Sequence, residues 1–160
     1  MPRPLVAWRE VALVLVALAF TGAVYVPDVG RGFVKDDFDW IAASRDGLHH
    51  PMAILLPGAV GFYRPIVSFT FALDAATYGL DSRGYGFTNL ALFLLCGGAL
   101  VHLGCAVGLT RRAAMLAAFI WMANPHGINM ALLWISGRTA LCLALFTALA
   151  VASFLKGRYV

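Results

Sequence analysis

Long apolar stretches separated by short polar ones dominate the chain. Three hydrophobic runs, over about 11–26, 87–109 and 139–155, come close to the roughly 20 residues that a helix needs to cross a bilayer. A fourth run, 113–135, is interrupted by Asn124-Pro125, where we expect the helix to kink and continue. The pattern therefore predicts an all-α, polytopic membrane protein with about four transmembrane helices.

The stretch between the first and second runs has a different composition. Residues 28–86 hold seven of the eight acidic residues, which favours contact with water or with the membrane interface. We therefore expect a long first outer loop that carries short interfacial helices. Only 12% of the 160 residues are charged and the mean hydropathy is +0.82, so residues 1–160 should form a single membrane unit without a separate soluble domain.

The basic residues are distributed unevenly about the predicted spans. Six of them, accompanied by a single acid, border one side, whereas the other six share the opposite side with seven acids. The first group consists of Arg3, Arg9, Arg111, Arg112, Lys156 and Arg158. Basic residues next to short loops stay in the cytoplasm, so we expect both termini to be cytoplasmic in a bacterial inner membrane or an endoplasmic reticulum membrane. The excess of basic residues flanks membrane segments, and we expect no nucleic-acid partner.

Two adjacent acids, Asp36 and Asp37, are candidates for chemistry on the outer face. A carboxylate near the end of a membrane helix can take a proton from a hydroxyl acceptor, and arginines on the same face can hold a phosphate. Arg64 and Arg138 are the arginines in question. The alternative is that both acids, together with Asp39, only solvate a loop.

A metal is a separate possibility, because Asp37-Phe38-Asp39 matches a D-x-D pattern. Three-letter matches are frequent by chance, and no histidine or further acid stands at a ligand spacing. We therefore predict no metal site and no cofactor, with a divalent metal left as the alternative.

Three segments occur in an order that resembles a known family. They are Phe33-Val-Lys-Asp-Asp-Phe-Asp-Trp-Ile41, Phe62-Tyr-Arg-Pro-Ile66, and Asn124-Pro-His126 followed by Trp134-Ile-Ser-Gly-Arg138. Together they resemble the N-terminal part of the GT-C superfamily of membrane glycosyltransferases. The nearest likeness is to the transmembrane and tetratricopeptide-repeat O-mannosyltransferases and their bacterial relatives.

The resemblance implies transfer of a sugar from a polyprenyl- or dolichyl-phosphate carrier to an acceptor on the periplasmic or lumenal face. The acceptor would be a protein, a lipid or a glycan. An aspartate of the first outer loop would be the catalytic base, and of the two candidates we favour Asp37 over Asp36. The residues that would bind substrate are Arg64, Arg138, Asn89 and His126.

Several of these roles have alternatives. Arg64 and Arg138 could anchor loops, and Asn89 could cap a helix. The family usually has His-Pro where this chain has Asn124-Pro125, which counts against a catalytic role for His126.

The family's catalytic modules contain more spans than this chain can form, so we expect the chain to be the N-terminal portion of a larger module. The competing interpretation is a small four-helix membrane protein that acts as a transporter subunit or assembly factor. Against it, His102 is the one ionisable residue in the middle of a predicted span, whereas ion-coupled transport usually needs intramembrane charge.

Overall fold

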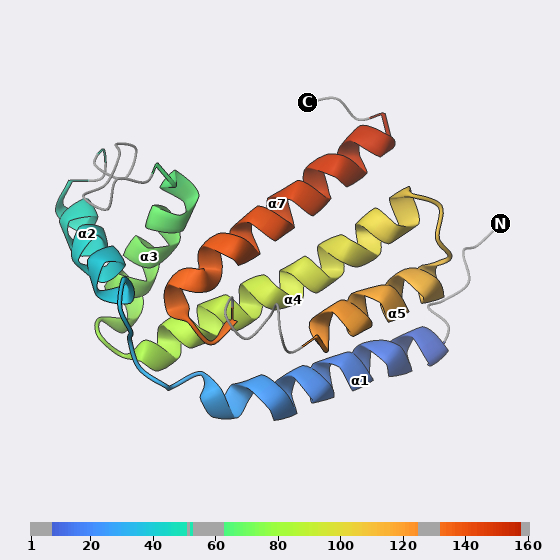
Figure 1. Ribbon diagram of the computed structural model, residues 1–160, viewed down its shortest axis with the longest axis horizontal. Helices are drawn as coiled ribbons and strands as arrows, with labels where there is room; N and C mark the ends of the chain where they lie inside the picture. The colour runs from blue at the N-terminus through green and yellow to red at the C-terminus, as the bar shows by residue number, and fades with distance from the viewer. Residues whose placement is uncertain (1–7, 51, 53–62, 125–131, 158–160) are drawn as a thin grey trace.

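The apolar stretches form helices whose axes are roughly parallel, with the chain direction alternating from one to the next (Figure 1). The computed structural model describes residues 8–50, 52, 63–124 and 132–157. The helices are α1 (Trp8–Tyr25), α4 (Ser82–Ala106), α5 (Arg111–Met122) and α7 (Arg138–Leu155). No strand occurs in the described part of the chain, and the predicted all-α class is confirmed.

Two further helices lie between α1 and α4 in the sequence and pair with each other at one end of the molecule (Figure 1). They are α2 (Asp37–His49) and α3 (Pro65–Tyr78), and both fall in the stretch predicted to be an outer loop. Short 3-10 turns stand at two further places in the described chain: η1 (Val26–Asp28) follows α1, and η3 (Ile135–Gly137) leads directly into α7.

The helix ends lie where the sequence supplies suitable residues. Pro65 opens α3, since its fixed φ suits a first helical turn, and Gly79 follows the helix with a φ of 60° that glycine adopts at little cost. The side chain of Asp81 caps α4 by accepting a hydrogen bond from the Arg83 backbone N–H at 3.0 Å. Thr110 caps α5 in the same way.

Three helices are long and apolar enough to cross a membrane, judged by length and composition. The candidate spans are Trp8–Asp28, Ser82–Ala106 and Ile135–Leu155. The second begins at Ser82 rather than Phe87 and ends at Ala106 rather than Leu109. Most of α1 is exposed, and its exposed side chains include large hydrophobic ones, as expected for a helix in contact with lipid.

The predicted fourth span, over 113–135, is described by the structure only at 113–124 and 132–135. Helix α5 ends at Met122, and its twelve residues cover about 18 Å, short of a hydrocarbon core of about 30 Å. Residues 125–131 lie outside the described part of the chain. Leu132 is helical, and Leu133 and Trp134 form the turn and bend that enter η3.

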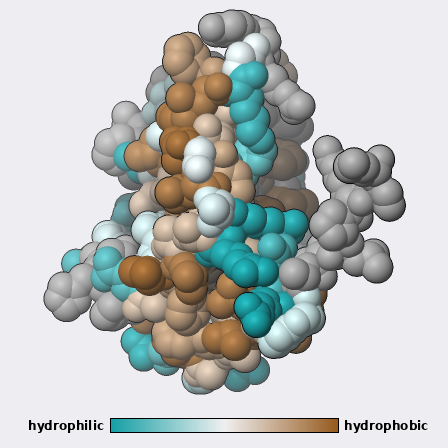
Figure 2. All heavy atoms as spheres, turned by 90° about the vertical axis from the view of Figure 1, so that its right-hand side faces the viewer, coloured by the Kyte–Doolittle hydropathy of each residue, from teal (hydrophilic) through white to brown (hydrophobic). Residues whose placement is uncertain are grey.

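The ends of the long helices are grouped. Glu10 near the start of α1 forms an ion pair with Arg111 at the start of α5, with 3.4 Å between Oε2 and Nε. Lys156, which follows α7, lies with its Nζ 3.3 Å from Nε2 of His102 near the end of α4. Hydrophilic atoms interrupt the apolar surface at this end (Figure 2). The pair α2 and α3 occupies the opposite end (Figure 1).

Helix α4 forms the centre of the fold, because both α5 and α7 pack along it. One buried hydrophobic cluster lies between the long helices and includes Tyr25, Phe93 and Leu141. A second lies where α2 and α3 meet α4 and η3, and it includes Trp40, Phe71 and Tyr85. The second cluster surrounds the polar side chains described below.

The close approach of α4 and α5 depends on one glycine. A Cβ added at Gly104 would lie 2.7 Å from the Cβ of Ala114 on α5, so the helices touch there. The sequence places Gly104 and Gly108 four residues apart, a spacing that favours close packing of two helices. Gly104 makes that contact, whereas Gly108 lies beyond the helix end with a φ of 97°.

We expect Gly104→Ala to lower the midpoint of thermal unfolding in detergent, because overpacking a close contact costs about 1–3 kcal/mol. Gly98→Ala on the same helix is the matched control, since a Cβ at that position meets no atom within 4 Å. The control should be neutral or slightly stabilising, because alanine favours a helix over glycine by about 1 kcal/mol. Equal midpoints for the two variants would contradict the close contact.

Candidate functional site

A buried arginine at the start of α7 organises the polar interior. Arg138 is 0% exposed, and its Nη2 lies 2.6 Å from Oδ2 of Asp74 on α3. Its Nε donates to Oδ1 of Asn89 at 2.9 Å, and its other donors reach Thr70 Oγ1 at 3.3 Å and the Tyr85 carbonyl at 3.2 Å. We call these five residues the Arg138 cluster.

Further contacts around the cluster offset the free-energy cost of removing the charges of Arg138 and Asp74 from water. The guanidinium carbon of Arg138 lies 4.2 Å from the ring centroid of Phe71, which gives a cation–π contact. Thr88 donates a hydrogen bond to the other carboxylate oxygen of Asp74 at 2.7 Å. A buried ion pair is tolerated only when such additional partners are present, so the cluster joins α3, α4 and α7 in one fixed geometry.

Asp37 joins the start of α2 to η3. Its side chain is 0% exposed, its Oδ2 accepts from the Val34 N–H at 2.9 Å, and its Oδ1 accepts from the Ser136 N–H at 2.7 Å. Asn89 holds the same segment from α4, because its Nδ2 donates to the carbonyls of Trp134 at 3.3 Å and Ile135 at 3.1 Å. The segment 134–136 is therefore fixed from two sides.

Asp36 differs from its neighbour. Within the described part of the chain, its Oδ1 is buried and has no hydrogen-bond partner. The indole nitrogen of Trp134 and the hydroxyl oxygen of Ser136 are also buried and without a hydrogen-bond partner in the described structure. These three polar groups belong to two segments, one at Asp36-Asp37 and one at 134–136. The two segments are in contact, because Asp37 accepts a hydrogen bond from the Ser136 N–H.

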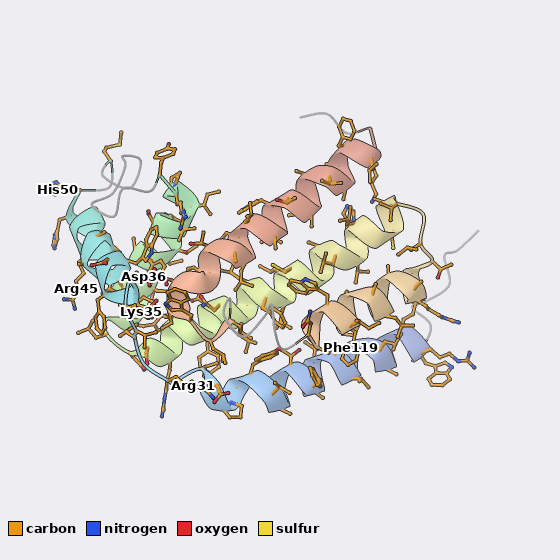
Figure 3. All side chains as sticks on the ribbon, in the orientation of Figure 1. Arg31, Lys35, Asp36, Arg45, His50 and Phe119 are labelled. Atoms are coloured by element: carbon orange, nitrogen blue, oxygen red, sulfur yellow. The ribbon has the colours of Figure 1, made fainter. Side chains whose placement is uncertain are left out.

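The turn before Asp36 is strained. Lys35 has a φ of 50°, in the left-handed region that non-glycine residues rarely adopt, and such residues are concentrated at functional sites. Its Nζ lies 6.0 Å from the ring centroid of Trp134. Figure 3 shows Lys35 and Asp36 together where the chain enters α2. A cation, a carboxylate and an aromatic ring thus meet at this junction.

The structure separates the predicted site residues into two groups. Asp37, Asn89 and Arg138 are fully buried and hold the scaffold together. Arg138 is enclosed, and each of its three side-chain nitrogens has a protein acceptor. Asn89 lies inside α4, past the first turn, so it is not a helix cap.

The remaining predicted residues lie closer to solvent or outside the described chain. Arg64 is half-buried at the N-cap position of α3, and its Nη1 donates to Oγ1 of Thr139 on α7 at 3.4 Å. This contact brings Arg64 to the residue next to Arg138. His126 lies outside the described residues.

The two aspartates of the D-x-D pattern do not face a shared metal position, because Asp37 is buried and Asp39 is exposed. Among the described residues, no group of three histidine, cysteine or acidic side chains is arranged to hold a metal ion.

The sequence analysis missed Asp74, Thr70 and Tyr85. Asp74 had a recognisable signal, because it is the one charged residue in α3 and an isolated charge in an apolar helix usually has a buried partner. Thr70 and Tyr85 had none, since their roles depend on contacts between distant segments.

The fold and the site define the class of protein as an all-helical chain with three candidate membrane spans and a polar junction at one end. Comparison with protein-family models, with curated proteins and with solved structures finds no match. The functional argument therefore depends on the junction itself.

We expect Arg138→Met and Asp74→Ala each to lower the free energy of unfolding by about 3–5 kcal/mol, because each leaves a buried charge without its partner. The loss in the double variant should be clearly smaller than the sum of the two, as for residues in direct contact. Denaturant titration in detergent, followed by helix content, measures both quantities.

The exposed pair Arg31–Asp28 supplies the control. Its ion pair is 2.7 Å long, yet the arginine side chain is 60% exposed, so Arg31→Gln should cost no more than about 1 kcal/mol. Equal losses for Arg31→Gln and Arg138→Met would show that burial of the Arg138 cluster does not determine its contribution.

Proposed function

We propose that this chain carries the catalytic base of a membrane glycosyltransferase. The enzyme transfers a sugar from a polyprenyl- or dolichyl-phosphate carrier to an acceptor on the outer face of the membrane. The observation that supports the proposal most directly is the contrast between two neighbouring acids. Asp37 has both carboxylate oxygens engaged by backbone N–H groups, whereas Asp36 keeps a buried oxygen without a partner in the described chain.

Asp36 is therefore the better candidate for the base, in place of the initially favoured Asp37. A general base must come within hydrogen-bonding reach of the proton it removes, and Asp37 is enclosed. The strained turn at Lys35 holds Asp36 at the entrance to α2. The fixed scaffold behind it keeps such a base in one position.

The reaction is balanced without an oxidant or reductant. The acceptor O–H gives its proton to Asp36 while its oxygen forms a bond to the anomeric carbon of the sugar. The bond between that carbon and the carrier phosphate breaks, and the phosphate leaves with the electron pair. Arg64, at the start of α3, is the nearest of the predicted arginines to solvent and is the candidate for stabilising the leaving phosphate.

The proposed topology follows from the charge distribution and the grouping of helix ends. Glu10, Arg111 and Lys156 lie at one end of the bundle, and Asp36 lies at the other. We propose a multi-pass protein in a bacterial inner membrane or an endoplasmic reticulum membrane, with the first end in the cytoplasm.

We expect Asp36→Asn to reduce sugar transfer by about 100- to 10,000-fold, since the amide keeps the shape of the side chain and loses the proton acceptor. The assay follows labelled sugar from a polyprenyl-phosphate donor into acceptors, in membranes that contain the full chain. Donor binding should persist in this variant. Normal turnover in Asp36→Asn would remove Asp36 as the base.

Two controls separate chemistry from folding. Asp39→Asn alters an exposed acid of the same turn and should leave transfer nearly unchanged. Asp37→Asn should lower thermal stability, because one of its two backbone N–H partners loses a carboxylate acceptor. If Asp37→Asn keeps full stability and abolishes transfer, the assignment of the two acids is reversed.

Topology is tested with single cysteines in a background that lacks Cys96, Cys105 and Cys142. A cysteine replacing Arg83 should react with an impermeant thiol reagent in intact cells, whereas one replacing Arg112 should react only after the membrane is opened. Both positions are exposed in the structure, so burial does not confound the comparison. The reverse labelling pattern would invert the orientation and remove the proposed chemistry from the outer face.

A further inference from the structure

A pocket opens beside the junction of α1 and α4, away from the Arg138 cluster. Its volume is about 380 Å³, and of the described residues that line it, two are arginines and none is acidic. Arg31 and Arg83 supply the charge, while Val26, Pro27 and Phe87 supply apolar surface. Such a lining suits an anionic group that is attached to a hydrocarbon.

Two glycines give the pocket its shape. A Cβ at Gly86 on α4 would overlap the carbonyl oxygen of Val29, so the turn after α1 lies directly on the helix. A Cβ at Gly30 would lie 3.1 Å from both Cγ and Nε of Arg83. The side chain of Arg83 therefore crosses the turn at Gly30 and reaches the pocket that Arg31 also lines.

Arg31 and Arg83 both keep side-chain N–H donors that could bind a ligand in the pocket. Arg31 contacts Asp28 through Nε and Nη2, both directed at the same carboxylate oxygen, which leaves its Nη1 for another acceptor. Asp81 uses its side chain to cap α4 through the backbone N–H of Arg83, and the structure records no ion pair for the Arg83 guanidinium among the described residues.

The pocket lies at the ends of two candidate spans. The first span ends at Asp28 and the second begins at Ser82, so both arginines are at the level expected for lipid headgroups. Val26 and Phe87, both substantially exposed, continue the apolar surface of the spans up to the arginines. A lipid phosphate could meet the guanidinium groups while its chains stay in contact with the helices.

We propose that Arg31 and Arg83 form a binding site for the phosphate of an anionic membrane lipid. The guanidinium fork of Arg83 matches two phosphate oxygens in a bidentate manner, and the Nη1 of Arg31, which Asp28 leaves unused, adds a further donor on the same pocket. The site does not depend on Asp36 or on sugar transfer, and it would exist in a protein with no transferase activity.

The test uses the purified full chain in detergent, with phosphatidylglycerol as the probe and phosphatidylcholine as the neutral reference, followed by native mass spectrometry. The wild type should retain phosphatidylglycerol in preference to phosphatidylcholine. The double variant Arg31→Gln/Arg83→Gln should weaken retention of phosphatidylglycerol by about tenfold or more, the size expected for losing charge-assisted hydrogen bonds. Retention of phosphatidylcholine should not change.

Arg112→Gln is the control, because it removes an arginine charge, one against the two of the double variant, from an exposed position beside α5's first residue at the opposite end of the bundle. A comparable loss in Arg112→Gln, or no loss in the double variant, would overturn the site. Addition of millimolar inorganic phosphate tests the source of the ligand. Displacement of phosphatidylglycerol by phosphate would show recognition of a soluble anion and would overturn the assignment to a lipid.

Discussion

The arrangement of the helices depends on one constraint, which is that the buried guanidinium group of Arg138 needs charged and polar partners. Arg138 has no exposed surface, and a charge in that position is stable only if charged and polar partners surround it. Those partners come from three places in the sequence, Asp74 on α3, Asn89 on α4 and Thr70 on α3. Satisfying one side chain therefore determines how the short helices at the end of the bundle attach to the long ones.

The position of the neighbouring turn η3 also depends on the hydrogen bonds that Arg138 needs. Asn89 accepts a hydrogen bond from Arg138 with its oxygen and donates to the carbonyls of Trp134 and Ile135 with its nitrogen. Asp37 approaches from α2 and accepts from the Ser136 N–H. The end of the molecule that carries α2 and α3 thus contains a polar network within an apolar surround, and this network accounts for three charged residues of the chain, Asp37, Asp74 and Arg138.

The sequence predicted the elements better than the connections between them. Apolar length identified α1, α4 and α7, because hydrophobic runs of membrane length have few alternatives. It did not identify the end of α5 at Met122, since an apolar stretch after a proline is compatible with a kinked helix or with a turn. Asp74 and Arg138 are 64 positions apart in the numbering, and no local pattern reports a contact across that distance.

The pair of adjacent acids illustrates why a motif alone does not assign roles. In the sequence, Asp36 and Asp37 are chemically equivalent, and only the direction of each side chain distinguishes them. The left-handed conformation of Lys35 turns the chain so that Asp37 faces inward to Val34 and Ser136, while Asp36 keeps an oxygen free of protein donors in the described structure. The two neighbours therefore differ in what the fold asks of them: Asp37 holds the backbone of two segments together, while the buried Oδ1 of Asp36 has no partner among the described residues.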